Sequence, residues 1–183
     1  MTAARVEGSP EESLGDFPGI FDTYFEEIFR YVAQRLGPAQ AEDVVAETFL
    51  AAFRKRERYD STRASVRTWL YGIATNLVGK QRRSEVRALR ARQRHGPGAD
   101  FPGPEERVTD QVSAQSLRPA LASAIASLGQ GERDVLLLMA LAGLSHQEIA
   151  VALGISYGTV GSRLSRARTK LRAALGGANP MEA

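Results

Sequence analysis

Short hydroxyl side chains and cations share one stretch near the C-terminal end of the chain. Residues 161–172 hold four arginines and one lysine, and no acidic residue. Cations on one face of a helix suit the phosphates of a nucleic-acid duplex, because each contact releases counterions condensed on the backbone. Thr159, Ser162 and Ser165 are short enough to approach base edges in a major groove. The chemistry predicted here is recognition of DNA.

Two short helices are predicted to carry this stretch. Ser145 and Glu148 have the spacing of a capping box, which begins a helix. Gly154 permits the left-handed backbone that ends this helix, and Ser156 can cap the next one after a short turn. Apolar residues then recur at helical spacing and must face inward: Val160, Leu164, Ala167 and Leu171. The pattern predicts a helix-turn-helix with a basic outer face, and the alternative is a solvated face on an ordinary bundle helix.

A second basic stretch covers residues 80–94 of a helix that starts near Val66. Its cations are opposed by Glu85 alone: Lys80, Arg82, Arg83, Arg87, Arg90, Arg92 and Arg94. Taken by itself, this stretch fits a solvated helix end as well as it fits contact with nucleic acid. Upstream, Asn76 is either exposed and idle or placed to pair with a base edge. Trp69 is interpreted as core packing rather than as a stacking surface.

The other elements are also predicted to be helices. Helical spacing begins at Phe17 and stops at Gly37, and a second helix runs from about Ala39 to Arg56, with Val45, Phe49, Ala52 and Phe53 facing the core. The predicted fold is all-α: two small helical domains joined by a flexible Gly/Pro-rich linker, the C-terminal one a helix-turn-helix. The expected boundaries are a disordered tail at 1–16, a first domain at 17–95, a linker at 96–113, a second domain at 114–176 and a tail at 177–183.

Composition excludes several classes of protein. The chain has 183 residues, 43% of them hydrophobic and 25% charged, which suits one ordinary domain or two small ones. It has no cysteine and two histidines, so we expect no metal site, no cofactor and no thiolate catalysis. Asp43 and Glu47 lie one helical turn apart and are explained as well by surface ion pairing as by a metal site, and no enzyme activity is predicted. With no signal peptide and no membrane-spanning run in the sequence, the expected location is cytoplasmic.

Three separated motifs resemble the extracytoplasmic-function (ECF) sigma factors of bacterial RNA polymerase, within the sigma-70 family. They are AEDVVAETFLAAFR, TWLYGIATN and GLSHQEIAVALGISYGTVGSRLSRAR, in family order over about residues 17–175. The resemblance implies a subunit that binds core polymerase (its beta and beta-prime subunits), directs it to specific promoters and helps to open the DNA. The first domain would bind the core and open the minus-ten element, and the second would read the minus-thirty-five element. An anti-sigma factor is a further implied partner, although nothing in the sequence marks its docking site.

The resemblance also implies roles for particular residues. The surface for the largest polymerase subunit would include Asp43, Val44, Glu47 and Phe49. Contacts to the minus-ten element, including a pocket for a flipped base, would come from Tyr59, Asp60, Ser61, Arg63, Ser65, Asn76, Lys80, Arg82 and Arg83. In the second domain, bases would be contacted by Ser162 and Ser165, near Thr159, and phosphates by Arg163, Arg166 and Arg168. Gly161 departs from the pattern, because relatives often carry Lys or Arg there and glycine cannot pair with guanine.

A free-standing helix-turn-helix regulator of response-regulator type is the alternative to a sigma factor. Its first half would be a receiver domain with alternating strands and helices and a phosphorylatable aspartate at a strand end, and the sequence shows neither. An RNA-binding or architectural protein would account for the basic stretch at 80–94 but not for the helix-turn-helix.

Overall fold

The computed structural model of this chain describes residue 14 and residues 16–95 and 117–175. Within these residues there are seven α-helices, one short 3-10 helix and no strand, which confirms the predicted all-α class. The predicted linker, the C-terminal tail and most of the N-terminal tail lie outside the described residues. The helices are α1 (Phe17–Leu36), α2 (Pro38–Lys55), η2 (Arg56–Arg58), α3 (Val66–His95), α4 (Leu117–Ser127), α5 (Gln130–Ala142), α6 (His146–Leu153) and α7 (Tyr157–Ala174).

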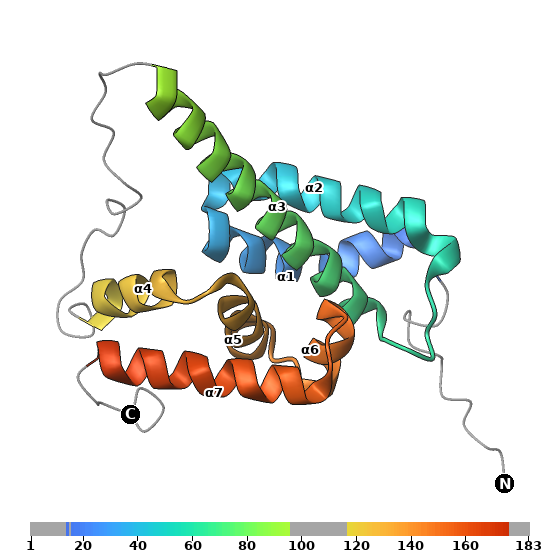
Figure 1. The fold of residues 1–183 in the computed structure, drawn as a ribbon. Coiled ribbons are helices and arrows are strands. Elements are labelled where there is room, and N and C mark those ends of the chain that lie inside the picture. Colours follow the sequence, from blue (N-terminus) through green and yellow to red (C-terminus); the bar gives the residue numbers. More distant parts are fainter. Residues whose placement is uncertain (1–13, 15, 96–116, 176–183) are drawn as a thin grey trace, which may run out of the picture.

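The N-terminal half is a hairpin of α1 and α2 crossed by α3 (Figure 1). The carboxylate of Asp16 accepts a hydrogen bond from the Gly19 N–H and so begins α1. Gly37 ends it with a φ of +85°, and Pro38 opens α2 immediately, which accounts for the tight turn between the two helices. Buried apolar residues from all three helices then form the core, among them Ile28, Val45 and Leu70.

The described part of the C-terminal half has four helices, and α7 lies on the side of the molecule away from α2 (Figure 1). Helices α4, α5 and α6 all contact α7, and its buried side chains are those predicted: Val160, Leu164, Ala167 and Leu171. Gly143 ends α5 with a φ of +63°, and Leu144 then turns its side chain into the core.

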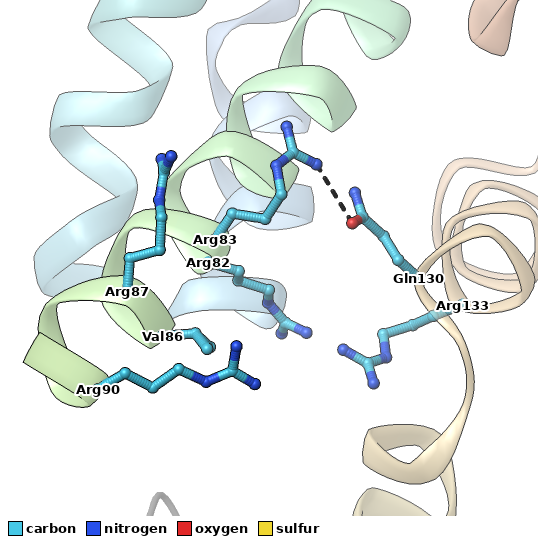
Figure 2. Close-up of a pocket in the computed structure, with 7 residues that line it drawn as sticks. All are labelled: Arg82, Arg83, Val86, Arg87, Arg90, Gln130 and Arg133. Carbon is cyan, nitrogen blue, oxygen red and sulfur yellow. Dashed lines mark hydrogen bonds between the residues drawn. The ribbon is translucent and has the colours of Figure 1, made fainter. Parts of the chain in front are cut away.

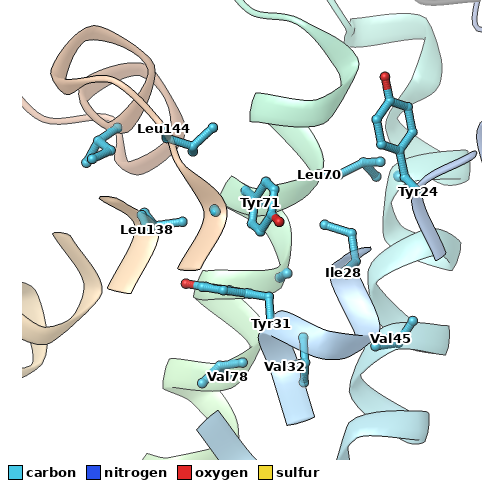
Figure 3. Packing of buried hydrophobic residues seen from close by; sticks show 14 of the residues in the cluster. Tyr24, Ile28, Tyr31, Val32, Val45, Leu70, Tyr71, Val78, Leu138 and Leu144 are labelled. Carbon is cyan, nitrogen blue, oxygen red and sulfur yellow. The ribbon is translucent and has the colours of Figure 1, made fainter. Parts of the chain in front are cut away.

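The two halves share one hydrophobic core, which the sequence did not predict. Leu138 and Leu144 of the C-terminal half lie beside Tyr71 and Tyr31 of the N-terminal half (Figure 3). All four side chains are almost fully buried. Removal of apolar area from water favours association, so this arrangement is stabilised by more than its polar contacts.

Polar contacts between the halves surround this shared core. Arg35 of α1 forms a buried ion pair with Asp134 of α5, and Arg67 of α3 donates to the carbonyl oxygen of Ala142. The Thr68 hydroxyl lies 3.4 Å from a carboxylate oxygen of Glu148 on α6. These contacts hold α3 against both α5 and α6.

Phe53 was predicted to face the core, and this prediction is wrong. Its side chain is 43% exposed, with its ring 5.2 Å from that of Phe17 and 4.1 Å from the guanidinium carbon of Arg56. Because α2 is covered by α1 and α3 on one side only, the last apolar position of its stripe falls at the rim of that contact.

Candidate nucleic-acid interface

The turn between α6 and α7 has the caps that the sequence predicted. Ser145 and Glu148 form a capping box: the Ser145 N–H donates to Glu148 Oε2 at 2.8 Å, and the Glu148 N–H donates to Ser145 Oγ at 3.3 Å. Gly154 ends α6 with a φ of +62°, and Ser156 Oγ accepts from the Thr159 N–H at 3.2 Å. The two helices therefore form a helix-turn-helix whose crossing is set by a very short connection.

The outer face of α7 carries the predicted base-reading and phosphate-binding residues. Ser162, Ser165, Arg166 and Arg168 are exposed, while Thr159 and Arg163 are half-buried. The Ser162 hydroxyl donates to the Thr159 carbonyl oxygen at 3.1 Å, so it lies back along its own helix in this arrangement. The face as a whole is accessible and cationic, as DNA contact requires.

An acid on a neighbouring helix partly neutralises this face, which the sequence did not predict. Glu132 at the start of α5 pairs with Arg166 Nε at 3.3 Å and with Lys170 Nζ at 2.7 Å. The hydrogen bond from Lys170 is the main reason that the pKa of Glu132 is lowered. The side chain of Arg163 lies against Gly131 of α5. A Cβ added at Gly131 would come within 2.9 Å of the Arg163 guanidinium carbon. Arg168 Nη2 also lies 3.8 Å from Met139 Sδ of α5, so all three predicted phosphate contacts touch that helix.

The loop before α3 is built by its own side chains. Asp60 Oδ1 accepts from the Thr62 N–H at 2.9 Å and from the Thr62 hydroxyl at 2.6 Å, and these bonds lower the pKa of Asp60. The Tyr59 hydroxyl donates to the Ala64 carbonyl oxygen at 2.8 Å. Ser65 Oγ accepts from the Thr68 N–H at 3.2 Å and so helps to begin α3. Ser61 and Arg63 are exposed at the tip of the loop.

This loop faces α6 across a cleft of about 420 Å³. The cleft is lined by residues 61–65 and Thr68 on one side and by Gln147, Glu148 and Val151 on the other. The loop predicted to contact the minus-ten element is therefore partly enclosed by the first helix of the helix-turn-helix.

The remaining residues predicted for the minus-ten element lie along α3 in two environments. Asn76 and Lys80 are exposed, and Lys80 Nζ is 3.5 Å from a carboxylate oxygen of Glu47. Arg82 is half-buried and donates to the Arg35 carbonyl oxygen, whereas Arg83 donates to Gln130 Oε1 of α5 at 3.2 Å. Trp69 is partly buried, with its ring 5.1 Å from that of Tyr59, in agreement with its interpretation as packing.

The predicted polymerase surface on α2 needs a correction. Asp43 and Glu47 are exposed, but Val44 and Phe49 are only 5% and 4% exposed and pack α2 onto the core. They have almost no surface left for a partner, because the core of the N-terminal half covers both side chains. Leu50, which is 47% exposed, is the apolar residue that accompanies the two carboxylates.

No group of acids and histidines suited to a metal ion occurs among the described residues. In the same part of the chain, no helix is long and apolar enough to cross a membrane. The arrangement is that of an all-helical DNA-binding protein in two parts, with a helix-turn-helix in the second.

Family models match both parts. The model of sigma-70 region 2 matches residues 20–94, and that of sigma-70 region 4 matches residues 118–171. The ECF RNA polymerase sigma factor SigL of Mycobacterium tuberculosis is 37% identical over 175 residues, 94% of this chain and 96% of its own. The RNA polymerase sigma factor CnrH of Cupriavidus metallidurans is 35% identical over 147 residues, 73% of this chain and 72% of its own.

Two solved structures have the same fold. One is CnrH in complex with the cytosolic domain of CnrY, with a TM-score of 0.61 and 25% identity over 92% of each chain. The other is the sigma factor RpoE in complex with the anti-sigma factor NepR from Bartonella quintana, with a TM-score of 0.65, 22% identity, and 90% and 99% of the two chains covered.

The chain belongs to the ECF RNA polymerase sigma factors. As a sigma factor it binds RNA polymerase core and promoter DNA and directs transcription to specific promoters. Because sigma-70 models match both halves, a response regulator with a receiver domain is not favoured.

Proposed function

We propose that the two halves divide promoter recognition between them. The exposed face of α7 reads the minus-thirty-five element, with Thr159, Ser162 and Ser165 toward bases and Arg163, Arg166 and Arg168 toward phosphates. The loop at 59–65, together with Asn76, Lys80, Arg82 and Arg83, holds the opened minus-ten element. The observation that carries this proposal is the one-sign outer face of α7 on a capped helix-turn-helix.

The halves must separate for both elements to be held at once. Elements centred at minus ten and minus thirty-five are about 25 base pairs apart, or roughly 85 Å along the duplex. A compact chain of this length has a radius of gyration of only about 16 Å. The 21 residues between α3 and α4 reach up to about 70 Å when fully extended, which is enough to let the halves move apart. The packed structure is therefore a state that precedes full promoter binding.

The exposed face of α2 is the proposed docking surface for core polymerase. Asp43, Glu47 and Leu50 place two carboxylates next to an exposed apolar side chain. Such a surface suits a basic helix of a partner, because complementary charge steers the encounter and apolar area stabilises it. An anti-sigma factor is a second proposed partner, since the structural relatives CnrH and RpoE are solved with CnrY and NepR.

The protein has no catalytic activity of its own in this proposal and works in the cytoplasm. Its contribution is to position polymerase and to stabilise an extruded base, which costs a few kcal/mol to remove from the stack. Polymerase supplies the chemistry of RNA synthesis.

The α7 assignment is tested by charge reversal. Holoenzyme is formed with bacterial core polymerase, bound promoter fragments are selected and sequenced, and affinity for an upstream fragment is measured over a range of salt. Arg163→Glu with Arg166→Glu should weaken binding across sequences and make the slope of log affinity against log salt shallower by about two.

Arg30→Glu with Lys55→Glu is the matched control, since both cations are exposed on α1 and α2, away from α7 and off the face of α2 that carries Asp43, Glu47 and Leu50. The control should leave the slope unchanged. An unchanged slope in the α7 variant would remove phosphate contact from the proposal.

The loop assignment is tested with Asn76→Ala and Arg63→Ala, which remove exposed side chains. We expect run-off transcription and permanganate reactivity of the opened strand to fall, while association with core polymerase stays the same. Loss of core association instead would show that these residues belong to the polymerase surface.

A further inference from the structure

An arginine-lined cleft lies where α5 meets the second part of α3 (Figure 2). It has a volume of about 350 Å³ and is lined by Arg82, Arg83, Val86, Arg87 and Arg90 of α3 and by Gln130 and Arg133 of α5. No Asp or Glu is among the described residues that line it. Five arginines thus line one cleft to which both halves contribute, and the guanidinium groups of Arg82, Arg90 and Arg133 come together in it (Figure 2).

Two of these guanidinium groups are held in place by main-chain carbonyls. Arg82 donates to the carbonyl oxygen of Arg35. Arg133 donates from Nε to the Ile125 carbonyl oxygen at 3.0 Å and from Nη2 to that of Leu128 at 2.8 Å. Figure 2 shows the Arg82 and Arg133 guanidinium groups pointing toward each other across the cleft, with that of Arg90 nearby. A ligand here would find its donors already positioned.

The positive charge of the cleft is only partly offset by acids in the described part of the chain, because Asp134 and Glu85 act on Arg82 from outside the lining. Asp134 is bound to the buried Arg35, and neither Arg82 nor Arg133 forms an ion pair with any described residue. Burial, followed by the charges of Arg133 and Arg35, lowers the pKa of Arg82. Burial, followed by the charge of Arg35, lowers the pKa of Arg133. An anion in the cleft would relieve this repulsion and replace the lost hydration.

We propose that this cleft binds two or three consecutive phosphates, as carried by inorganic polyphosphate or by a nucleoside polyphosphate. Arginine presents paired N–H donors that match phosphate oxygens, and guanidinium groups arriving from two helices suit a compact anion with several charges. The volume is in the range of small-molecule sites. A duplex is too wide to enter a cleft of this size, which separates the site from the α7 surface.

Such a ligand stabilises the packed arrangement of the halves. Arg82 and Arg90 belong to the N-terminal half and Arg133 to the C-terminal half, so the complete site exists only while the halves are together. A ligand that binds one of two states shifts the population toward it in proportion to its differential affinity. This inference goes beyond promoter recognition, and it is tested without polymerase or promoter DNA, so its failure would leave the proposed function intact.

The test is calorimetric titration of the full chain at fixed ionic strength with tripolyphosphate, with a nucleoside triphosphate and with sulfate. We expect one site per chain for the two triphosphates and none for sulfate. Arg90→Gln, an exposed position, should weaken triphosphate binding by about tenfold. Arg54→Gln, equally exposed but on α2, is the matched control and should bind as the wild type does.

A second experiment measures whether ligand binding favours the packed arrangement of the two halves. The chain has no cysteine, so dyes on Gln40→Cys of α2 and Ala173→Cys of α7 report the separation of the halves by energy transfer. Tripolyphosphate should raise the fraction in the short-distance state, and Arg90→Gln should reduce that effect.

The titrations show whether the cleft binds a polyphosphate and whether it recognises the phosphates alone or a nucleoside polyphosphate. Equal affinity for both triphosphates assigns recognition to the phosphates alone, and tighter binding of the nucleotide assigns it to a nucleoside polyphosphate; both support the site. Equal binding by Arg90→Gln and Arg54→Gln, or sulfate binding as tight as that of tripolyphosphate, would overturn it.

Discussion

The two ends of the contact between the halves are built differently. At one end α6 packs onto α3 through backbone: a Cβ on Gly72 would lie 2.5 Å from the Ala152 carbonyl oxygen. At the other end α5 meets α3 and α1 through side chains: a Cβ on Gly79 would meet the amide of Gln130, and Asp134 pairs with Arg35. The arginine-lined cleft lies at this second end.

The difference teaches which end can adjust. Backbone atoms of two packed helices cannot move aside without moving the helices, so the α6 end fixes how the halves fit together. Side chains can change rotamer and charged groups respond to ions, so the α5 end can be tuned by ligand or salt. The exposed loop at 59–65 lies at the fixed end, beside α6.

The largest expected effect comes from Asp134→Asn at the α5 end. The substitution leaves the Arg35 guanidinium buried without its carboxylate, which costs about 3–5 kcal/mol in the packed state. Because separation of the halves returns Arg35 to water, the chain should open rather than unfold. Energy transfer between dyes on Gln40→Cys and Ala173→Cys should report the longer distance.

A double substitution provides the control for this prediction. Arg35→Met with Asp134→Leu removes both charges, and well-packed apolar residues often replace a buried pair without loss. The double variant should stay closed. If the single variant Asp134→Asn also keeps the short dye distance, the ion pair does not hold the halves together.

The next effect is expected at the α6 end, from Gly72→Ala. The added methyl group meets main chain, and overpacking of this kind costs about 1–3 kcal/mol. Gly79→Ala is the matched control, because its methyl group meets only the flexible side chains of Gln130 and Arg83 and alanine favours a helix. The dye distance and the midpoint of thermal unfolding should change for Gly72→Ala and not fall for Gly79→Ala. The same loss in both would mean that the two ends are equally rigid.

A smaller effect is expected from Glu132→Gln, which releases two cations of α7. Arg166 and Lys170 become available to phosphates, so upstream promoter DNA should bind about two- to fivefold more tightly. Glutamine still accepts the Gly129 N–H, so the start of α5 is kept. Since the pKa of Glu132 is lowered in the fold, its contribution to stability is present at neutral pH and is lost as pH falls below 4.5. An affinity equal to that of wild type would indicate that the pairs do not compete with DNA.

The smallest effect is expected from Gly161→Ala. A Cβ at this position meets nothing within 4 Å, and alanine in a helix interior is favoured over glycine by about 0.5–1 kcal/mol. The midpoint of thermal unfolding should rise while promoter affinity stays the same. A fall in affinity would show that DNA approaches the backbone closely at Gly161.

Much of the local structure was predictable because its causes are local. Ser145 with Glu148, Gly154 and Ser156 mark the ends of α6 and α7 by hydrogen bonds and backbone angles within a few residues. The four inward positions of α7 follow from helical period alone. The burial of Val44 was not predicted. The sequence shows which faces of α2 are apolar, but it does not show how much of each face the neighbouring helices cover.

The spacing of Gly72 and Gly79 was the available signal for contact between the halves. Seven residues apart, they lie on one face of α3, and glycine inside a helix marks a close approach. Neither position says which helix approaches. The pairing of Glu132 with Arg166 and Lys170 had no comparable signal, since it joins α5 to α7 across more than thirty positions of the sequence.

The sequence by itself determined the helices, the turn between α6 and α7 and the cationic character of the α7 face, because period, caps and charge act over one or two turns. Only the tertiary structure decided that the halves share a core, that α6 covers one side of the loop at 59–65, and that arginines of α3 and α5 surround one cleft. Those features depend on which helices pack against each other. Burial of apolar area drives this packing, and because it is non-directional, an apolar face in the sequence does not specify which helix will cover it.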